Sequence, residues 1–276
     1  MAARPLLLAV AGAGATRGLL AAARAVPACT GQWLERSNYR GRPVSLVAGP
    51  VLAVAASATA CASAPTSRLG RAALLAGLAA GALGAYDDIA GARPGQHGDK
   101  GFRGHLSALA QGRVSTGTVK AAGIGAVAVV AARAVAAGPA DTLVTGGVIA
   151  GTANLVNLLD LRPGRALKSI LLLGLPLVPG PAGPLLAGPL GAAAAVLPDD
   201  LAEHAMLGDA GANAIGAIVG LGLAASTGRA GRVALLAALV AITAASERVS
   251  FTGVIERTRV LREIDALGRR RAPAAA

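Results

Sequence analysis

The sequence predicts an all-α protein: a polytopic membrane protein of about nine transmembrane helices, with cytoplasmic loops and a C-terminal amphipathic helix. Composition is the first observation behind this prediction. Hydrophobic residues make up 54% of the 276 residues and charged residues 14%, whereas about a quarter of a typical soluble domain is charged. A mean hydropathy of +0.60 leaves too few polar residues to cover a soluble core, so a soluble domain and a disordered chain are both disfavoured.

Apolar segments are the second observation. A hydrocarbon layer about 30 Å thick takes about 20 helical residues to cross, and nine segments reach or approach that length. The sixth and seventh are short and flank Pro179-Gly180-Pro181, which predicts a tight helical hairpin. The nine segments are residues 3–25, 44–63, 69–86, 117–138, 142–159, 166–179, 183–198, 211–227 and 231–247. We therefore expect a transmembrane helical domain over residues 1–248 and a cytoplasmic amphipathic tail over residues 249–276.

The distribution of charge is the third observation, and it orients the chain. Basic residues are concentrated in alternate loops and in the tail, which places these parts in the cytoplasm and the N-terminus outside by the positive-inside rule. The net charge of +12 follows from this bias and from affinity for anionic lipid and phosphate, so we expect no nucleic-acid partner. The cytoplasmic loops cover residues 26–43, 87–116, 160–168 and 199–210. We expect a multi-pass protein of the inner (plasma) membrane.

Acidic residues follow the same bias, although the positive-inside rule does not require it. Thirteen of the 14 acidic residues fall on the cytoplasmic side, and Asp141 is the exception. Both signs of charge are therefore concentrated at one face of an otherwise apolar protein. This concentration predicts chemistry at the cytoplasmic surface of the membrane.

Carboxylates occur at the ends of two apolar segments. Asp87 and Asp88 follow the third segment, where adjacent carboxylates repel each other unless a cation or a polar group compensates; a solvated helix terminus is the alternative. Asp209 lies near the start of the eighth segment, between Gly208 and Ala210 and close to Gly211. Glycines there allow close approach of a metal or a phosphate, and an N-cap before a glycine-rich packing helix is the alternative.

A stripe of amides and a carboxylate closes the fifth segment. Asn154, Asn157 and Asp160 are spaced i, i+3 and i+6, which places them along one helical face that points toward the cytoplasm. Such a stripe is costly in an apolar span without a ligand or a polar neighbour. Hydrogen bonding between helices is the alternative interpretation for the asparagines.

The long loop after the third segment carries Lys100 and Arg103 among glycines. This composition suits phosphate binding, although a basic cytoplasmic loop is also expected from the positive-inside rule alone. Three carboxylate sites and basic loops on one membrane face together predict a Mg²⁺ site that handles phosphates. Mg²⁺ prefers oxygen ligands, and the basic side chains would neutralise the remaining negative charge.

The order of these motifs resembles that of the polyprenyl-phosphate N-acetylhexosamine-1-phosphate transferases, glycosyltransferase family 4. The superfamily includes phospho-N-acetylmuramoyl-pentapeptide transferase and the UDP-GlcNAc:undecaprenyl-phosphate GlcNAc-1-phosphate transferases. The resemblance covers the chain from about residue 38 to residue 213. Its motifs in this chain are Asn38-Tyr39-Arg40-Gly41-Arg42-Pro43-Val44, Tyr86-Asp87-Asp88, Lys100-Gly101, Asn154-x-x-Asn157-x-x-Asp160 and Gly208-Asp209-x-Gly211.

The resemblance implies a fold of about ten helices with the active site on the cytoplasmic face. It implies a phosphotransferase that uses Mg²⁺ to move a sugar 1-phosphate, such as N-acetylhexosamine 1-phosphate, from a UDP-sugar to polyprenyl phosphate. UMP is released, and the product serves cell-envelope glycan synthesis, including cell wall biogenesis. Asp209 would be the principal metal ligand, with Asp87 and Asp88 at the lipid phosphate or the metal. Substrate would be bound by Lys100, Arg103, Asn154, Asn157 and Asp160.

The chain departs from the family pattern at two places. Where the family has Asp-Gly after the asparagine stripe, this chain has Asp160-Leu161-Arg162-Pro163-Gly164. The region that matches a histidine-rich cytoplasmic loop, residues 250–257, has no histidine. The tail interleaves apolar residues with arginines over residues 254–271, which predicts an amphipathic helix on anionic lipid. Shielding the place of the histidine loop is the alternative.

Two other classes of protein are alternatives. A catalytically silent membrane scaffold or regulator of the same family would keep the fold, but it has no physical need for costly carboxylates. A transporter or channel would carry charges at the membrane midplane and show internal repeats. Small-residue faces such as Gly77-x-x-x-Gly81 permit a homodimer.

Overall fold

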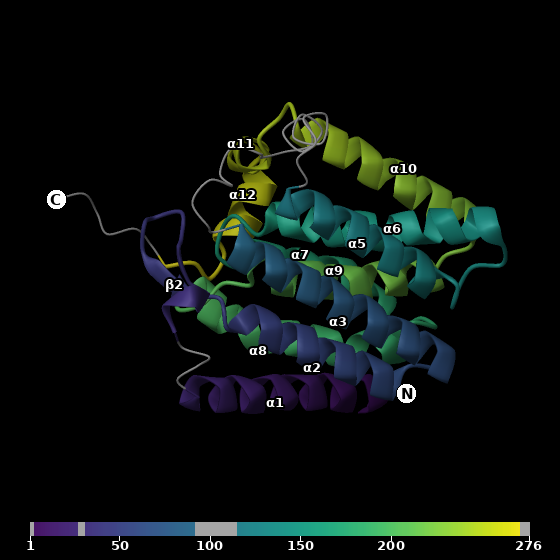
Figure 1. The fold of residues 1–276 in the computed structure, drawn as a ribbon, viewed down its shortest axis with the longest axis horizontal. Coiled ribbons are helices and arrows are strands. Elements are labelled where there is room, and N and C mark those ends of the chain that lie inside the picture. Colours follow the sequence, from purple (N-terminus) through teal and green to yellow (C-terminus); the bar gives the residue numbers. More distant parts are fainter. Residues whose placement is uncertain (1–2, 27–30, 92–114, 271–276) are drawn as a thin grey trace.

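The computed structural model describes residues 3–26, 31–91 and 115–270, and this part of the chain is all-α apart from one small hairpin (Figure 1). The hairpin pairs β1 (Glu35–Ser37) with β2 (Pro43–Ser45). Two short 3-10 helices are η2 (Gln32–Leu34) and η3 (Leu175–Leu177). The α-helices are α1 (Ala3–Ala25), α2 (Ala48–Ser63), α3 (Ser67–Ala90), α5 (Thr116–Ala132), α6 (Pro139–Leu159), α7 (Arg165–Gly174), α8 (Gly183–Leu201), α9 (Gly208–Ala225), α10 (Arg229–Ser246), α11 (Phe251–Arg257) and α12 (Arg259–Ala266).

Each of the nine apolar segments predicted from the sequence contains a helix, from α1 to α10. Among the described residues, five helices are long and apolar enough to cross a membrane, namely α1, α3, α6, α9 and α10. Helices α2 and α5 are apolar but shorter, and α7 is a ten-residue helix. The structure therefore supports an all-α protein compatible with a membrane.

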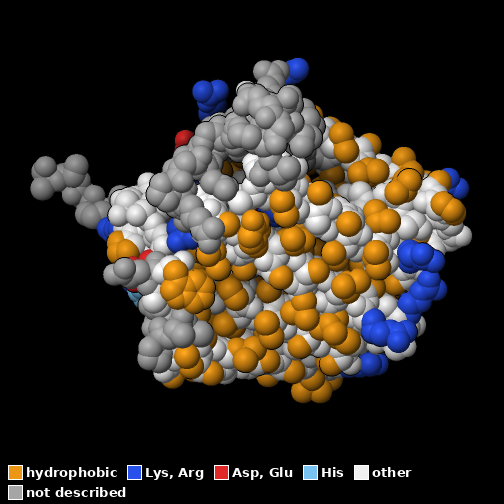
Figure 2. Space-filling model, in the orientation of Figure 1, with side chains coloured by type: hydrophobic (Ala, Val, Ile, Leu, Met, Phe, Trp, Pro, Cys, Tyr) orange, Lys and Arg blue, Asp and Glu red, His pale blue; other side chains and the backbone are white. Residues whose placement is uncertain are grey.

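The outer surface has the character expected beside lipid. Hydrophobic side chains cover the middle of the face shown in Figure 2, and basic side chains gather toward its edges. Large apolar side chains such as Leu6, Leu143 and Val240 are at least 60% exposed. Contiguous exposed apolar surface of this kind marks a membrane or protein contact rather than a water-facing surface.

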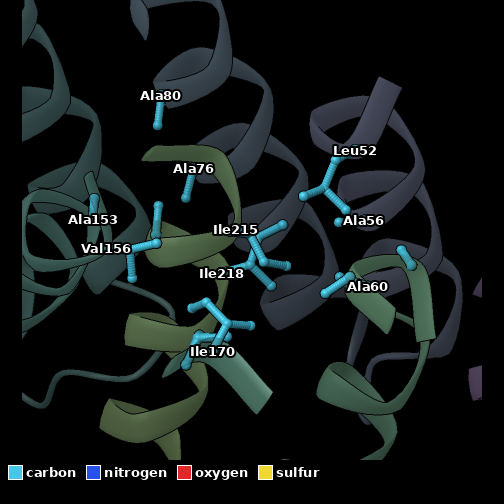
Figure 3. Packing of buried hydrophobic residues seen from close by; sticks show 14 of the residues in the cluster. Leu52, Ala56, Ala60, Ala76, Ala80, Ala153, Val156, Ile170, Ile215 and Ile218 are labelled. Carbon is cyan, nitrogen blue, oxygen red and sulfur yellow. The ribbon is translucent and has the colours of Figure 1, made fainter. Parts of the chain in front are cut away.

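Helix α9 lies at the centre of the bundle and packs against α2, α3 and α6. Every residue from Ala210 to Gly222 is buried, and Ile215 and Ile218 face small residues of the neighbouring helices (Figure 3). Small residues let the helix backbones approach closely, which is the usual basis of helix packing in membranes. A Cβ atom at Gly84 of α3, for example, would overlap the carbonyl oxygen of Asp209 at the start of α9.

The small-residue face on α3 is used within this chain. A Cβ atom at Gly77 would meet Ser57 of α2 and Ile218 of α9, and one at Gly81 would lie 2.8 Å from Cβ of Ala53. The face is therefore covered by α2 and α9 rather than left open to a second copy. This face is therefore not available to a second copy, and a homodimer stays a prediction.

The hairpin replaces the beginning of the second segment, which we expected to be helical from residue 44. Asn38 forms the turn: its side-chain oxygen accepts hydrogen bonds from the backbone N–H groups of Arg40 (2.8 Å) and Arg42 (3.0 Å). Gly41 in this turn has a φ of +72°, a conformation that glycine adopts without strain. Strand β2 then pairs with residues 204–206 through the backbone of Ser45, so the hairpin is held against the bundle.

The C-terminal tail forms two short helices, α11 and α12, rather than the single amphipathic helix that we expected. Thr258 separates them with an extended backbone, φ −94° and ψ 111°. Both helices lie at the end of the bundle that also carries the hairpin (Figure 1). The tail is therefore close to the loops of this end.

The opposite end of the bundle contains a buried ion pair between α6 and α10. Arg232 donates to Asp141 at 3.1 Å and to Thr145 at 3.2 Å, and the side chains of Arg232 and Asp141 are only 10% and 7% exposed. Helix α10 is otherwise poorly buried, because only Arg232 and Leu239 are buried on it. The pair therefore fixes α10 to the rest of the bundle.

We predict that Arg232→Ala lowers the free energy of unfolding by about 3–5 kcal/mol, because it leaves the Asp141 carboxylate buried without its cation. The matched control is Arg229→Ala, which removes an exposed arginine one turn away on the same helix. The measurement is the unfolding of detergent-solubilised protein. A loss below about 1 kcal/mol, the range of exposed ion pairs, would show that the pair does not anchor α10.

Candidate functional site

Two carboxylates and one lysine from three helices meet at the hairpin end of the bundle. Asp87 lies in the last turn of α3, Asp209 in the first turn of α9, and Lys120 in the first half of α5. Lys120 Nζ is 2.5 Å from Asp87 Oδ2 and also forms an ion pair with Asp209 Oδ2. The side chains of Asp87, Asp209 and Lys120 are 15%, 26% and 16% exposed, so the cluster is sheltered but accessible.

Asp88 has a different position from its neighbour Asp87. Its carboxylate oxygens accept hydrogen bonds from the backbone N–H groups of Asp209 (3.1 Å) and Ala210 (3.0 Å). These N–H groups belong to the first turn of α9 and have no partner within that helix. Asp88 therefore caps α9 from the end of α3, and a negative charge there is also favoured by the helix dipole.

Asp160 follows α6 and faces the same cluster. It accepts a hydrogen bond from the backbone of Gly208, and its nearest charges include Asp88, Asp200 and Asp209. Burial raises the pKa of the Asp160 carboxyl well above its ordinary value, and these neighbouring carboxylates raise it further. The sequence prediction that the ends of three segments bring carboxylates together is therefore consistent with the positions of Asp87, Asp160 and Asp209.

A cavity of about 290 Å³ opens beside Asp160. Its walls come from the hairpin, the loop after α6 and the segment that joins α8 to α9. The lining residues are Ser37, Asn38, Tyr39, Val44, Asp160, Leu161, Arg162, Pro163, Asp200, Glu203, Ala205 and Met206. The Arg162 guanidinium lies over the Tyr39 ring, 4.4 Å from its centroid, which joins two of the walls by a cation–π contact.

The asparagine stripe divides into two parts in the structure. Asn154 donates to Thr243 of α10 at 3.2 Å, which is the hydrogen bond between helices that the alternative interpretation predicts. Asn157 lies one turn closer to Asp160 and is partly exposed. Binding of substrate by these asparagines stays a prediction.

Lys100 and Arg103, predicted to contact phosphate, lie outside the described residues. Lys120 was missed by the sequence analysis, although a lysine inside an otherwise apolar segment is a signal for a buried partner or a functional site. The structure supplies that partner twice, because both Asp87 and Asp209 lie against its ammonium group.

The chemistry of the two carboxylates fits a Mg²⁺ ion that takes its other ligands from phosphate or water. The described residues contain no group of three or more His, Cys, Asp or Glu side chains arranged around a metal position. Asp87 and Asp209 nevertheless converge on one cation, the Lys120 ammonium. Mg²⁺ is commonly bound by one or two carboxylates together with substrate phosphates and water, so two converging carboxylates are sufficient for this mode.

No protein-family model matches the chain, and no curated protein matches it. The description of this protein therefore rests on its fold and its site. The chain is an all-α protein, compatible with a membrane, with a carboxylate and lysine cluster and an adjacent cavity at one end.

Asp200 provides a test of the electrostatics of this end. Asp200 lies in the last turn of α8, beyond the apolar stretch that ends at residue 198. It is 3% exposed and accepts a hydrogen bond from the backbone N–H of Gly164 at 2.9 Å. Burial raises the pKa of the Asp200 carboxyl to about 6, although the Gly164 hydrogen bond and nearby basic groups oppose the change. The folded state therefore holds this proton more tightly than the unfolded state does. The resulting stability is present below about pH 4 and is lost as the pH rises through 6.

We predict that Asp200→Asn, which keeps an acceptor for Gly164 but carries no charge, is more stable than the original protein at pH 7.5. The expected gain is on the order of 2–3 kcal/mol, and it should vanish near pH 4. Unfolding of the detergent-solubilised protein at both pH values measures it. Asp199→Asn is the control, because it removes ion pairs with Arg17 and Arg24 and should give no gain. A less stable Asp200→Asn at pH 7.5 would contradict this account.

Proposed function

We propose that the chain is a Mg²⁺-dependent transferase that moves a sugar 1-phosphate from a UDP-sugar to polyprenyl phosphate at the cytoplasmic face of the plasma membrane. The observation that carries the proposal is the convergence of Asp87 and Asp209 on Lys120, next to the cavity that Asp160 lines. The ordered motifs that resemble the polyprenyl-phosphate N-acetylhexosamine-1-phosphate transferases support the same reaction. In this proposal all nine apolar helices lie within the membrane and the N-terminus is outside.

The cavity is the proposed place of the nucleoside. Its walls offer an aromatic ring at Tyr39, a guanidinium at Arg162 and carboxyl groups at Asp160 and Asp200, which suit the planar base and the ribose hydroxyls. The diphosphate then extends toward Lys120. The lipid phosphate reaches the same point from the membrane, because α3, α5 and α9 bring Asp87, Lys120 and Asp209 together at the end of an apolar bundle.

The main barrier of this reaction is electrostatic, because an anionic lipid phosphate must approach an anionic diphosphate. Preorganised charge at the reacting groups lowers such a barrier. Lys120 would neutralise phosphate oxygens, while Asp87 and Asp209 would hold Mg²⁺. When bound, Mg²⁺ would offset the negative charge of the diphosphate and of the leaving UMP.

The proposed step is a direct, in-line attack. An oxygen of the lipid phosphate forms a bond to the β-phosphorus of the UDP-sugar, the phosphorus that carries the sugar. The bond from that phosphorus to the bridging oxygen breaks, and UMP leaves with the electron pair. The attacking group needs no base, because a phosphate monoester with a second pKa of about 6 is mostly dianionic at neutral pH. A trapped phospho-Asp87 or phospho-Asp88 intermediate would contradict the direct attack.

We predict that the purified protein releases UMP when it receives undecaprenyl phosphate, Mg²⁺ and the correct member of a panel of UDP-sugars. Asp209→Asn and Lys120→Met should each reduce the rate at least about a hundredfold, because the first weakens the proposed Mg²⁺ site and the second removes the cation that would neutralise phosphate oxygens. Removal of Mg²⁺ with a chelator should stop the reaction, and addition of Mg²⁺ should restore it.

The control is Asp199→Asn. Asp199 lies outside the cluster and pairs with Arg17 and Arg24, so this variant should keep the activity. Silence across the panel, with a known transferase of this type active in the same detergent, would favour the catalytically silent scaffold. Activity that persists in Asp209→Asn would place the chemistry elsewhere.

A further inference from the structure

The segment after α12 contacts all three walls of the cavity from outside. Arg269 Nε donates to the carbonyl oxygen of Pro163 in the loop after α6, at 2.8 Å. Arg270 lies 3.1 Å from His204 in the segment between α8 and α9, and its carbonyl accepts a hydrogen bond from Arg40 of the hairpin turn at 3.3 Å. One short stretch of the tail therefore connects the three parts of the chain that enclose the cavity.

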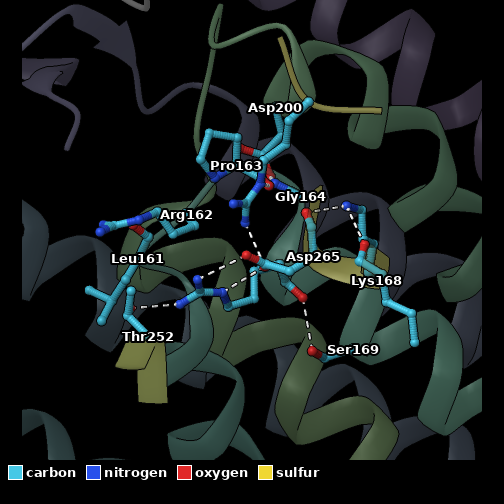
Figure 4. A network of polar contacts seen from close by, with 12 residues as sticks. Leu161, Arg162, Pro163, Gly164, Lys168, Ser169, Asp200, Thr252 and Asp265 are labelled. Atoms are coloured by element: carbon cyan, nitrogen blue, oxygen red, sulfur yellow. Dashed lines mark hydrogen bonds and ion pairs between the residues drawn. The ribbon is translucent and has the colours of Figure 1, made fainter. Parts of the chain in front are cut away.

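Asp265 holds this stretch against the bundle (Figure 4). Its two carboxylate oxygens accept hydrogen bonds from Nε and Nη2 of Arg165, at 2.8 and 3.1 Å, and Oδ1 also accepts one from Arg269 at 2.6 Å. The side chains of Arg165, Asp265 and Arg269 are 4%, 10% and 16% exposed. A bidentate arginine–carboxylate pair fixes orientation as well as distance, so Asp265 sets the direction of Arg269.

Three further hydrogen bonds secure the tail. Lys168 Nζ donates to the carbonyl oxygens of Ile264 (2.9 Å) and Asp265 (2.8 Å), near the C-terminal end of α12, where a cation is favoured by the helix dipole. Arg165 Nη1 donates to Thr252 of α11 at 3.0 Å. Arg165 and Lys168 both belong to α7, so the tail is fastened to the helix that directly follows the cavity loop.

The tail contact binds the one residue of the loop over residues 160–164 that lies directly before Gly164. Gly164 has a φ of +73° and donates to Asp200 on one side of the loop at 2.9 Å, while Arg269 binds Pro163 on the other side. The loop is also bound through the Arg162–Tyr39 contact and the Asp160–Gly208 hydrogen bond, and without the tail it would lose the contact that fixes Pro163. A binding loop that is already ordered costs less free energy to organise when a ligand arrives.

We infer that Asp265 and Arg269 are positioning residues, which hold the loop over residues 160–164 in its ligand-ready form without touching the ligand. The identity of the ligand, the nucleotide part of a UDP-sugar, rests on the proposed function. The restraint of the loop by the tail does not depend on it. The experiment therefore has one arm that measures the opening of the loop and a second arm that measures the kinetics of the proposed reaction.

The first arm measures hydrogen–deuterium exchange in peptides that cover residues 160–168 and 200–206 of the full-length protein in detergent. Asp265→Asn keeps the shape of the side chain but removes its charge, and we expect exchange at these peptides to accelerate about tenfold through local opening. The conservative Asp265→Glu should restore most of the protection. The matched control is Glu263→Gln, which breaks an exposed ion pair with Arg259 on the same helix and should leave both peptides unchanged.

The second arm compares the KM for the UDP-sugar, the KM for undecaprenyl phosphate and kcat. Asp265→Asn should raise the KM for the UDP-sugar about tenfold and change the other two constants less than about twofold, because uniform binding is lost without loss of transition-state stabilisation. Unchanged exchange in Asp265→Asn would overturn the inference whether or not the protein is a transferase. Accelerated exchange in a protein that uses no UDP-sugar would support the restraint and reject the proposed function.

Discussion

The first turn of α9 is fixed by a residue of another helix, and the geometry of the site depends on that contact. The N–H groups of Asp209 and Ala210 are bound by the carboxylate of Asp88 at the end of α3. Gly84, one turn earlier on α3, allows the two backbones to approach this closely. Because Asp87 precedes Asp88 in the chain, the same contact places Asp87 beside Asp209 and leaves both free to face Lys120.

Several carboxylates lie close together around this contact, and the structure reduces the repulsion between them in three ways. Lys120 bridges Asp87 and Asp209, Asp88 is bound at the positive end of α9, and the raised pKa of Asp160 lets this group take up a proton. Repulsion between carboxylates is strong where water is partly excluded. Among the described residues, Asp87, Asp88 and Asp209 still outnumber Lys120 and Arg36 at this contact, which favours the binding of a further cation.

Hydropathy predicted the positions of the helices, because a helix that faces lipid or the core is apolar whatever its neighbours are. The hairpin was not predictable, since its turn is specified by one side chain, Asn38, rather than by a repeating pattern. Motif spacing placed Asp87, Asp160 and Asp209 at one end because each follows or begins an apolar segment. The separate positions of Asp87 and Asp88, and the participation of Lys120, depend on how helices pack, which spacing along the chain does not contain.

The two ends of the bundle differ in how far their charged side chains are exposed. Charges in an apolar helical protein are tolerated where they are paired or where water and backbone groups reach them. At one end Asp141 and Arg232 form an ion pair with at most 10% of either side chain exposed. At the other end three helices present carboxylates and a lysine that remain 15–26% exposed beside a cavity. The first arrangement is nearly shut off from solvent, whereas the second keeps partly exposed charges beside a cavity, which is why the proposed function is placed there.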